Sequence, residues 1–291
     1  MESPSIRNAI IMAAGTSSRF VPLSAEIPKG LIEVKGEILI ERQIRQLQEA
    51  GITDITVVVG YKAEMFSYLK NKFNVGIVYN DDYKRYNNSS SVIRVLDKLG
   101  NTFLCSSDNY FLKNVFIKNS EESYYSALYA KGDTKEYCLS VDSSDHITGV
   151  TVGGKDSWFM VGHVYFSEEF SLRFKEILSK DYENESTRHG YWEDVYICHI
   201  TDLPKMKIYR YGEEDIKEFD SLDELRLFDK SYWSDTRSPL LKNIAQRLNC
   251  GEEEISDFSN IPHTGEFLLF SFMKGCNIYE YNGQTKQIRM L

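Results

Sequence analysis

Apolar residues in the first hundred positions follow two alternating patterns. Continuous or β-branched apolar runs predict buried strands at residues 6–13, 54–60, 75–78 and 101–108. Between them, apolar residues at helical spacing predict helices at residues 40–47, 63–72 and 91–99. Strands that alternate with helices are typical of a mostly parallel sheet covered by helices on both faces. We therefore predict an α/β fold for this part of the chain.

The rest of the chain has a different pattern. Residues 120–166 contain the turn sequences KGD and VGGKD, which predict short added antiparallel strands. A helix is predicted over residues 168–180, and the polar sequence NESTRHG (184–190) predicts a loop. After residue 230, an apolar stripe at 240–248 predicts a short helix, and strand-like runs surround YNGQ. We therefore divide the chain into a large domain, residues 1–230, and a small α+β appendage, residues 231–291.

Composition narrows the class of protein. The 291 residues carry a formal net charge of −9, with a pI near 5.2. This acidic balance argues against binding to nucleic acid or to anionic membranes, which needs a basic face. Five scattered cysteines fit a reducing compartment, and the N-terminus has no signal-peptide pattern. No apolar run approaches the roughly 20 residues of a membrane span, so we expect a cytoplasmic protein that inserts into no membrane.

The sequence AAGTSSRF (13–20) follows the first predicted strand and points to a phosphate ligand. Small residues in such a turn present backbone amides to an anion, and Arg19 adds a planar donor suited to phosphate oxygens. Lys29 follows Pro28 and adds a second cation. A tight strand-to-helix turn would need the same small residues, but not the two cations. Asp108 ends another predicted strand, where ligands bind in such sheets.

The run AIIMAAGTSSRFVPLSAEIPKGLIEVKGEILIERQI (9–44) resembles the signature of nucleotidyltransferases that activate sugar phosphates and choline phosphate. That signature has a strand, then AAGxGxR, a PLT-like segment and PK. One departure is Ser17, which stands at the second glycine. The sequences VVVGYKAEMFSYL, NDDYKRYNNSSSV, SSDNYF and YWEDVY look like successive blocks of the phosphocholine cytidylyltransferase branch. The resemblance covers residues 6–230 and implies a Rossmann-like nucleotidyltransferase fold.

The resemblance also implies roles for individual residues. Arg19 and Lys29 correspond to the phosphate-binding groups of the branch. Asp108 and Asp194 correspond to the carboxylates that hold Mg²⁺, with Glu193 as a competitor for the second position. The backbone expected to surround the phosphates is that of Ala13, Ala14, Gly15, Thr16 and Ser17, and the segment expected to read the pyrimidine base is Asn87, Asn88 and Ser89.

Aromatic residues beside acids indicate the acceptor. Tyr191 and Trp192 precede Glu193 and Asp194, and Tyr137 lies near a cage position of the branch. Aromatic faces with carboxylates bind quaternary ammonium groups, although aromatic residues also cluster in cores. The predicted reaction is Mg²⁺-dependent transfer of CMP from CTP to phosphocholine. The alternatives are a phosphonate amine such as 2-aminoethylphosphonate, a sugar 1-phosphate, or a non-catalytic nucleotide-binding protein.

Residues 240–290 resemble the start of a choline-kinase-like domain, in which a helix precedes a strand pair with an NG segment. The TN sequence usual in the nucleotide-covering turn is absent from HTGEF. Because the chain stops at Leu291, before any catalytic loop, we expect no kinase activity. The appendage is interpreted as a vestige, a cut within a longer protein, or a packing element.

Overall fold

The computed structural model describes residues 4–264 and 267–291. Its contacts divide the chain into two compact units. Unit 1 contains the described residues up to Gly15 together with Ile40–Lys217, and unit 2 contains Thr16–Leu39 and Glu218–Leu291. The division differs from the predicted boundary at residue 230, because unit 2 takes residues 16–39 from within the predicted large domain.

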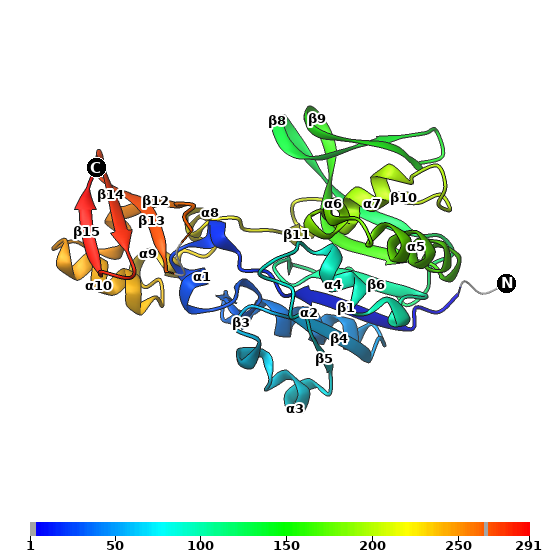
Figure 1. Ribbon diagram of the computed structural model, residues 1–291, viewed down its shortest axis with the longest axis horizontal. Coiled ribbons are helices and arrows are strands. Elements are labelled where there is room, and N and C mark those ends of the chain that lie inside the picture. Colours follow the sequence, from blue (N-terminus) through cyan, green and yellow to red (C-terminus); the bar gives the residue numbers. More distant parts are fainter. Residues whose placement is uncertain (1–3, 265–266) are drawn as a thin grey trace. The chain divides into compact units, whose positions relative to one another are not determined.

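Unit 1 is built on a seven-stranded sheet with the order β10-β8-β9-β6-β1-β4-β5 (Figure 1). The strands are β1 (Asn8–Ala13), β4 (Asp54–Val59), β5 (Gly76–Tyr79), β6 (Thr102–Ser106), β8 (Tyr124–Val141), β9 (Ile147–Phe166) and β10 (Lys207–Arg210). Strands β5, β4, β1 and β6 are parallel, as are β8 and β10, whereas β9 is antiparallel to both β6 and β8. A separate antiparallel pair joins β7 (Tyr110–Phe111) to β11 (Ile216–Lys217). The predicted strands of the first hundred residues and the mostly parallel sheet are confirmed.

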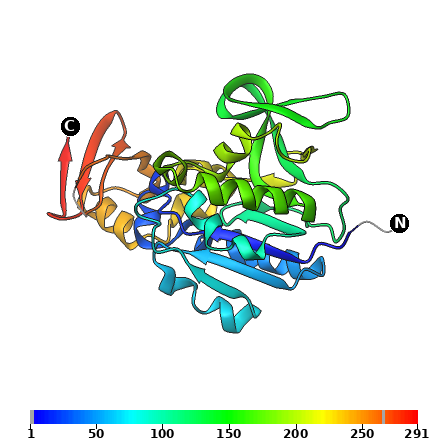
Figure 2. The same ribbon diagram turned by 45° about the vertical axis from the view of Figure 1, so that its right-hand side comes forward.

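Helices of unit 1 supply much of its core. They are α2 (Leu39–Glu49), η3 (Ala63–Phe66), α3 (Leu69–Phe73), α4 (Ser89–Ile93), η4 (Leu96–Lys98), α5 (Glu168–Asp181), α6 (Glu185–His189) and α7 (Trp192–Cys198). Apolar residues of α4, α5 and α7 pack in one cluster with Ile10, Leu104 and Phe166 of the sheet, so these helices cover the same face, and α5 crosses the sheet in Figure 2. The predicted helices at 40–47 and 168–180 are confirmed.

The prediction of short strands at 120–166 is wrong. The segment forms two long strands, β8 and β9, whose hairpin extends beyond the sheet in both views (Figures 1 and 2). The glycines that suggested turns lie inside these strands at positive φ, 78° for both Gly132 and Gly153. Register shifts between Ala130 and Asp133 absorb the extra residue there, as β-bulges do. Glycine in the strands therefore marks irregular pairing and not chain reversal.

The predicted loop at 184–190 is also wrong, because it contains the short helix α6. The hydroxyl oxygen of Ser89 lies within hydrogen-bond distance of two carbonyl oxygens, those of Thr187 (2.6 Å) and Gly190 (2.8 Å), to which it can donate its one hydrogen. These distant contacts satisfy backbone groups at the end of the helix. The predicted helices at 63–72 and 91–99 are each divided into a 3₁₀ turn and a short α-helix.

Unit 2 combines short helices with a four-stranded antiparallel sheet in the order β12-β13-β14-β15. The strands are β2 (Glu33–Val34), β3 (Glu37–Ile38), β12 (Ile255–Asn260), β13 (Leu269–Lys274), β14 (Asn277–Asn282) and β15 (Gln287–Met290). The helices are η1 (Ser18–Phe20), α1 (Leu23–Glu26), η2 (Lys29–Leu31), α8 (Leu222–Phe228), α9 (Ser231–Ser234), α10 (Pro239–Arg247) and η5 (Glu252–Glu254). The predicted α+β character of the appendage is confirmed. No helix in the described part of the chain is long and apolar enough to cross a membrane.

A buried histidine in unit 1 makes stability sensitive to acid. His163 on β9 is fully buried among aromatic rings, and neither ring nitrogen has a hydrogen-bond partner among the described residues. Burial lowers the pKa of His163 to about 3 from an ordinary value of 6.5. Below pH 6.5 the unfolded chain binds a proton at this residue that the folded chain does not. Stability from this group is therefore complete above pH 6.5 and is lost as the pH falls toward 3.

We expect His163→Phe to reduce this acid sensitivity, because phenylalanine cannot be protonated. At pH 5, 1.5 pH units below the ordinary pKa, the histidine costs the folded state about 2 kcal/mol relative to pH 7. The free energy of unfolding in urea, measured at pH 7 and pH 5, should fall by about that much more in the wild type than in the variant. An equal fall in both proteins would show that His163 is not the group responsible.

Candidate active site

The turn after β1 carries the residues predicted to bind phosphate. Ala14 is held by a hydrogen bond from Tyr61 N to its carbonyl oxygen, at 3.0 Å. Gly15 is exposed, and no other atom of the described residues lies within 4 Å of its Cβ position. Ser17 has a left-handed backbone with φ of 49°, a conformation that glycine adopts at lower cost. The serine therefore keeps the loop conformation for which the family signature uses glycine.

The two predicted phosphate-binding cations contact one carboxylate within unit 2. Arg19 Nη1 lies 2.8 Å from Asp220 Oδ2, and Lys29 Nζ lies 3.6 Å from Asp220 Oδ1. The Arg19 side chain is 75% exposed and that of Lys29 only 7%. A buried ammonium group is costly unless an opposite charge lies nearby, and Asp220 supplies one. The structure thus brings Arg19 and Lys29 together on one carboxylate, with the guanidinium exposed and the ammonium group buried.

Asp220 was not predicted from the sequence. It precedes Ser221, the N-cap of α8: Glu224 N donates to Ser221 Oγ at 3.1 Å, and Asp220 N donates to Glu224 Oε2 at 2.8 Å. The local sequence DSLDE carries this signal for a helix start. Its relation to Arg19, which lies 201 residues away in the chain, does not appear in any local pattern.

Asp108 lies in a braced turn after β6 in unit 1. Ser107 N donates to Met12 O at 3.1 Å, which ties the turn to the end of β1. Asn109 Nδ2 donates to Gly162 O at 3.1 Å, which ties it to β9. The half-buried Asp108 is therefore held at the carboxyl end of a central strand, the edge at which ligands bind in such sheets.

Two residues of the segment predicted to read the base, Asn88 and Ser89, form hydrogen bonds with neighbouring elements. Ser89 is fully buried, and its hydroxyl is engaged by the 187–190 backbone. Asn88 Nδ2 donates to Glu193 Oε2 at 3.1 Å, and Asn88 Oδ1 accepts from Trp192 N at 2.8 Å. These contacts fasten α4 to the start of α7. Of the three residues, Asn87 remains the candidate for a direct base contact.

Asp194 caps α7 and contacts two tyrosines. Its Oδ2 accepts a hydrogen bond from Tyr191 N at 2.8 Å, and its Oδ1 accepts one from Tyr137 OH at 3.0 Å. The rings of Tyr137 and Tyr191 lie edge to face, with centroids 6.5 Å apart. Tyr191 is 44% exposed. Asp194 is thus contacted by the backbone of one tyrosine and the hydroxyl of another, and the rings of these two tyrosines lie next to each other.

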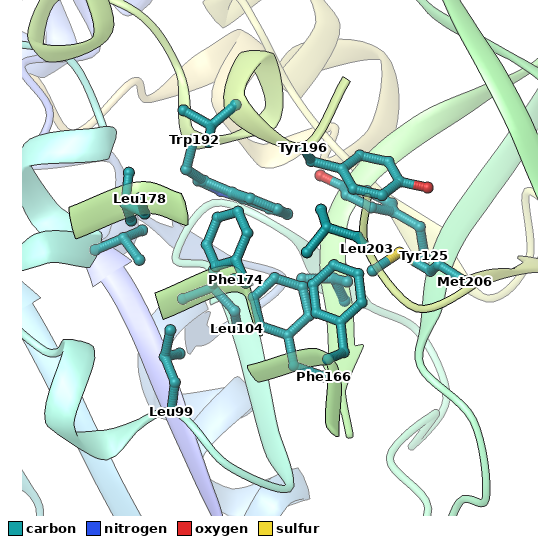
Figure 3. Packing of buried hydrophobic residues seen from close by; sticks show 14 of the residues in the cluster. Leu99, Leu104, Tyr125, Phe166, Phe174, Leu178, Trp192, Tyr196, Leu203 and Met206 are labelled. Atoms are coloured by element: carbon teal, nitrogen blue, oxygen red, sulfur yellow. The ribbon is translucent and has the colours of Figure 1, made fainter. Parts of the chain in front are cut away.

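Trp192 belongs to the hydrophobic core and not to this aromatic pair. Its side chain is 1% exposed and stacks on the ring of Tyr125, with the ring centroids 5.9 Å apart. The rings of Phe166 and Phe174 pack edge to face against the indole, with centroid separations of 5.4 and 5.8 Å (Figure 3). A cation–π contact needs an accessible ring face, so this burial corrects the prediction that Trp192 forms part of the cage.

Glu193 lies next to Asp194 in α7, where its surroundings favour the protonated form. Burial raises the pKa of Glu193 to about 7, although Asn88 and the hydroxyl of Tyr125, 3.2 Å from Oε1, hydrogen-bond to its carboxyl group. Near neutral pH its negative charge is therefore incomplete. Asp194 supplies the carboxylate in direct contact with Tyr137 and Tyr191. The role of Tyr125 was not predicted, because only the fold brings β8 against α7.

Comparisons with known proteins agree with this architecture. The model of the MobA-like NTP transferase domain matches residues 9–138. A 2-aminoethylphosphonate cytidylyltransferase from Lancefieldella rimae is 36% identical over 229 residues, covering 77% of this chain and 93% of the relative. A choline-phosphate cytidylyltransferase from Streptococcus pneumoniae is 32% identical over 218 residues, covering 75% of this chain and 95% of the relative.

A solved structure of CTP:phosphocholine cytidylyltransferase from S. pneumoniae superposes with a TM-score of 0.74. It is 32% identical and covers 77% of this chain and 98% of that one. The fold and the relatives define the molecule as a nucleotidyltransferase. The chain belongs to the family of cytidylyltransferases that these bacterial enzymes represent, which confirms the resemblance seen in the sequence.

Proposed function

We propose that the enzyme transfers CMP from CTP to a small amine that carries a phosphate or phosphonate group, with phosphocholine as the first candidate. The observation that carries this proposal is the contact of Asp194 with the edge-to-face pair Tyr137 and Tyr191. A carboxylate flanked by aromatic rings suits an ammonium head group. A sugar ring would instead need an array of hydrogen-bonding groups directed at its hydroxyls.

The reaction needs little proton transfer. An oxygen of the acceptor phosphate attacks the α-phosphorus of CTP, the bond from that phosphorus to the bridging oxygen breaks, and pyrophosphate leaves. The barrier lies in bringing two anions together and in stabilising the charge that develops at phosphorus. Arg19 and Lys29 would bind the triphosphate, and backbone amides of residues 13–17 would contact its oxygens. Asn87 would contact the cytosine base.

Mg²⁺ is the expected cofactor, and the residues present fit it in part. Mg²⁺ binds one or two protein carboxylates and takes its other ligands from phosphates and water. Asp108 fits as a half-buried carboxylate in a braced turn. The second predicted ligand, Asp194, accepts hydrogen bonds on both carboxylate oxygens, from Tyr191 N and from Tyr137 OH, so we propose Asp108 as the principal protein ligand. When bound, Mg²⁺ would neutralise charge on the triphosphate.

A second acceptor, 2-aminoethylphosphonate, is favoured by the burial of Trp192. Without the indole, the proposed pocket has two tyrosine rings and one carboxylate, which encloses a trimethylammonium group less completely. A primary ammonium donates three hydrogen bonds, and Asp194 with the nearby hydroxyl of Tyr137 offers acceptors for them. The relative from L. rimae is named for this substrate.

Tyr191→Ala should raise KM for the amine acceptor about tenfold and leave KM for CTP nearly unchanged. The expected loss corresponds to a cation–π contact of between 0.5 and 2 kcal/mol, or about two- to thirtyfold. The matched control is Tyr129→Ala, which removes an exposed tyrosine from β8 that does not contact Asp194 in the structure. Pyrophosphate release should be measured with phosphocholine, phosphoethanolamine, 2-aminoethylphosphonate and glucose 1-phosphate.

The panel separates the alternatives. Fastest turnover with phosphocholine supports the first candidate, and fastest turnover with 2-aminoethylphosphonate supports the second. Glucose 1-phosphate as the best acceptor would overturn the amine pocket. Failure to release pyrophosphate with any of them, by a folded protein that binds CTP, would support a non-catalytic role.

A further inference from the structure

Residues 16–39, which carry both phosphate-binding cations, form one compact unit with the C-terminal part of the chain. We infer that residues 218–291 act as a scaffold that positions Arg19 and Lys29, and that Glu26 is the principal positioning residue. The inference rests on the proposed role of these two cations in binding CTP. It assigns a task to the appendage, which the sequence left open between a vestige, a cut and a packing element.

Glu26 joins the signature segment to α10. It stands at the end of α1, between the two cations in sequence, and its Oε1 accepts a hydrogen bond from Leu240 N at 2.9 Å. Its other oxygen accepts one from the hydroxyl of Ser238. Ser238 is the N-cap of α10, and its hydroxyl also accepts from Leu241 N at 3.0 Å. A carboxylate at this helix end satisfies backbone donors and interacts favourably with the helix dipole.

A second set of contacts holds the end of the same segment. The hydroxyl of Tyr232, a residue 1% exposed, donates to Glu33 O at 2.6 Å. Lys35 N donates to Asp229 Oδ2 at 2.7 Å. Arg237 Nη2 lies 3.4 Å from Glu33 Oε1. Residues on both sides of Lys29 are therefore tied to the appendage, so the segment has little freedom to move independently of it.

The appendage is itself braced by a buried arginine. The side chain of Arg226 on α8 is fully buried, and it donates to Ile255 O at 2.6 Å and to Glu252 O at 2.8 Å. Asp223 lies 3.1 Å from the same guanidinium. Buried charged hydrogen bonds of this kind are costly to break, because breaking them leaves a charge unpaired. Arg226 thus joins helix α8, which begins shortly after Asp220, to strand β12.

Positioning by Glu26 predicts a selective loss of phosphate binding. Glu26→Ala removes both hydrogen bonds to α10, and a displacement of about 1 Å at a reacting group can cost up to a hundredfold in rate. We expect kcat/KM for CTP to fall by about ten- to a hundredfold, with KM for the acceptor unchanged. The affinity for inorganic pyrophosphate, measured by calorimetry, should fall in parallel.

Two further variants test the mechanism. Glu26→Gln should restore near wild-type values, because its carbonyl oxygen accepts from Leu240 N and its amide donates to Ser238 Oγ. Arg247→Ala is the matched control, since Arg247 donates to Lys286 O at 2.6 Å within the appendage and does not contact residues 16–39 in the structure. If Glu26→Ala proves too unstable to purify, Tyr232→Phe removes a single hydroxyl from the second set of contacts and should show the same selective loss at severalfold magnitude.

Wild-type kcat/KM for CTP in the folded Glu26→Ala or Tyr232→Phe enzyme would overturn the inference. So would an equal loss in Arg247→Ala, because the effect would then be a general loosening of the appendage. The proposed function fails separately: if removal of the Lys29 charge is also harmless, the phosphate-binding role is wrong. If removal of the Lys29 charge lowers kcat/KM for CTP and Glu26→Ala does not, only the inferred scaffold role of residues 218–291 is wrong.

Discussion

Replacing Lys29 with methionine is expected to lower kcat/KM for CTP by about a hundredfold or more. Methionine keeps most of the buried stem and removes the charge, so the loss would report electrostatic stabilisation of the triphosphate and of the charge developing at phosphorus. The effect should be large because this side chain is only 7% exposed, and charges excluded from water interact more strongly.

The measurement is steady-state pyrophosphate release with varied CTP, next to a thermal melt of each protein. Lys230→Ala, which removes an exposed lysine from the same unit, is the control and should behave as wild type. A Lys29→Met enzyme that retains near wild-type kcat/KM would remove this residue from the proposed site, whatever its effect on the melt.

Asp108→Asn should abolish measurable turnover, whereas Asp194→Asn should not. Asparagine keeps the shape of the side chain but loses the negative charge that Mg²⁺ requires of a carboxylate ligand. Asp194→Asn should instead raise KM for the acceptor, because the tyrosine pair loses its neighbouring charge. Turnover measured across a Mg²⁺ titration separates the two kinds of loss, since only a metal ligand shifts the Mg²⁺ dependence.

The opposite result is equally informative. A shifted Mg²⁺ dependence in Asp194→Asn would return this carboxylate to the metal-binding role first predicted from the sequence. Activity retained in Asp108→Asn would exclude the braced turn after β6 from metal binding.

Features encoded by neighbouring residues were predictable from the sequence. The β-branched run that forms β4 and the apolar stripe of α2 determine their elements through local periodicity. The phosphate-binding turn was proposed because Gly15, Arg19 and Lys29 lie within fifteen positions. These predictions depended on residues that lie close together in the sequence, so they could be made without knowing the fold.

Features created by distant contacts were not predictable. Nothing local to Trp192 distinguishes a ring that faces a ligand from one that stacks on Tyr125, because its orientation depends on where β8 passes α7. The contact of Arg19 with Asp220 likewise depends on the fold, because the two residues are 201 positions apart in the chain. The sequence around YWED could not show that Asp194 would contact Tyr137.

The long separation between Glu26 and its partners has a consequence for biosynthesis. Glu26 precedes Ser238 by 212 residues, and Glu33 precedes Tyr232 by 199. At roughly 5–20 residues per second, translation takes about ten to forty seconds to cover that distance. Throughout this interval the hydrogen bonds from Ser238, Leu240 and Tyr232 to residues 26 and 33 cannot form, although the strands around β1 can already pair. These contacts therefore form only after residue 240 has left the ribosome.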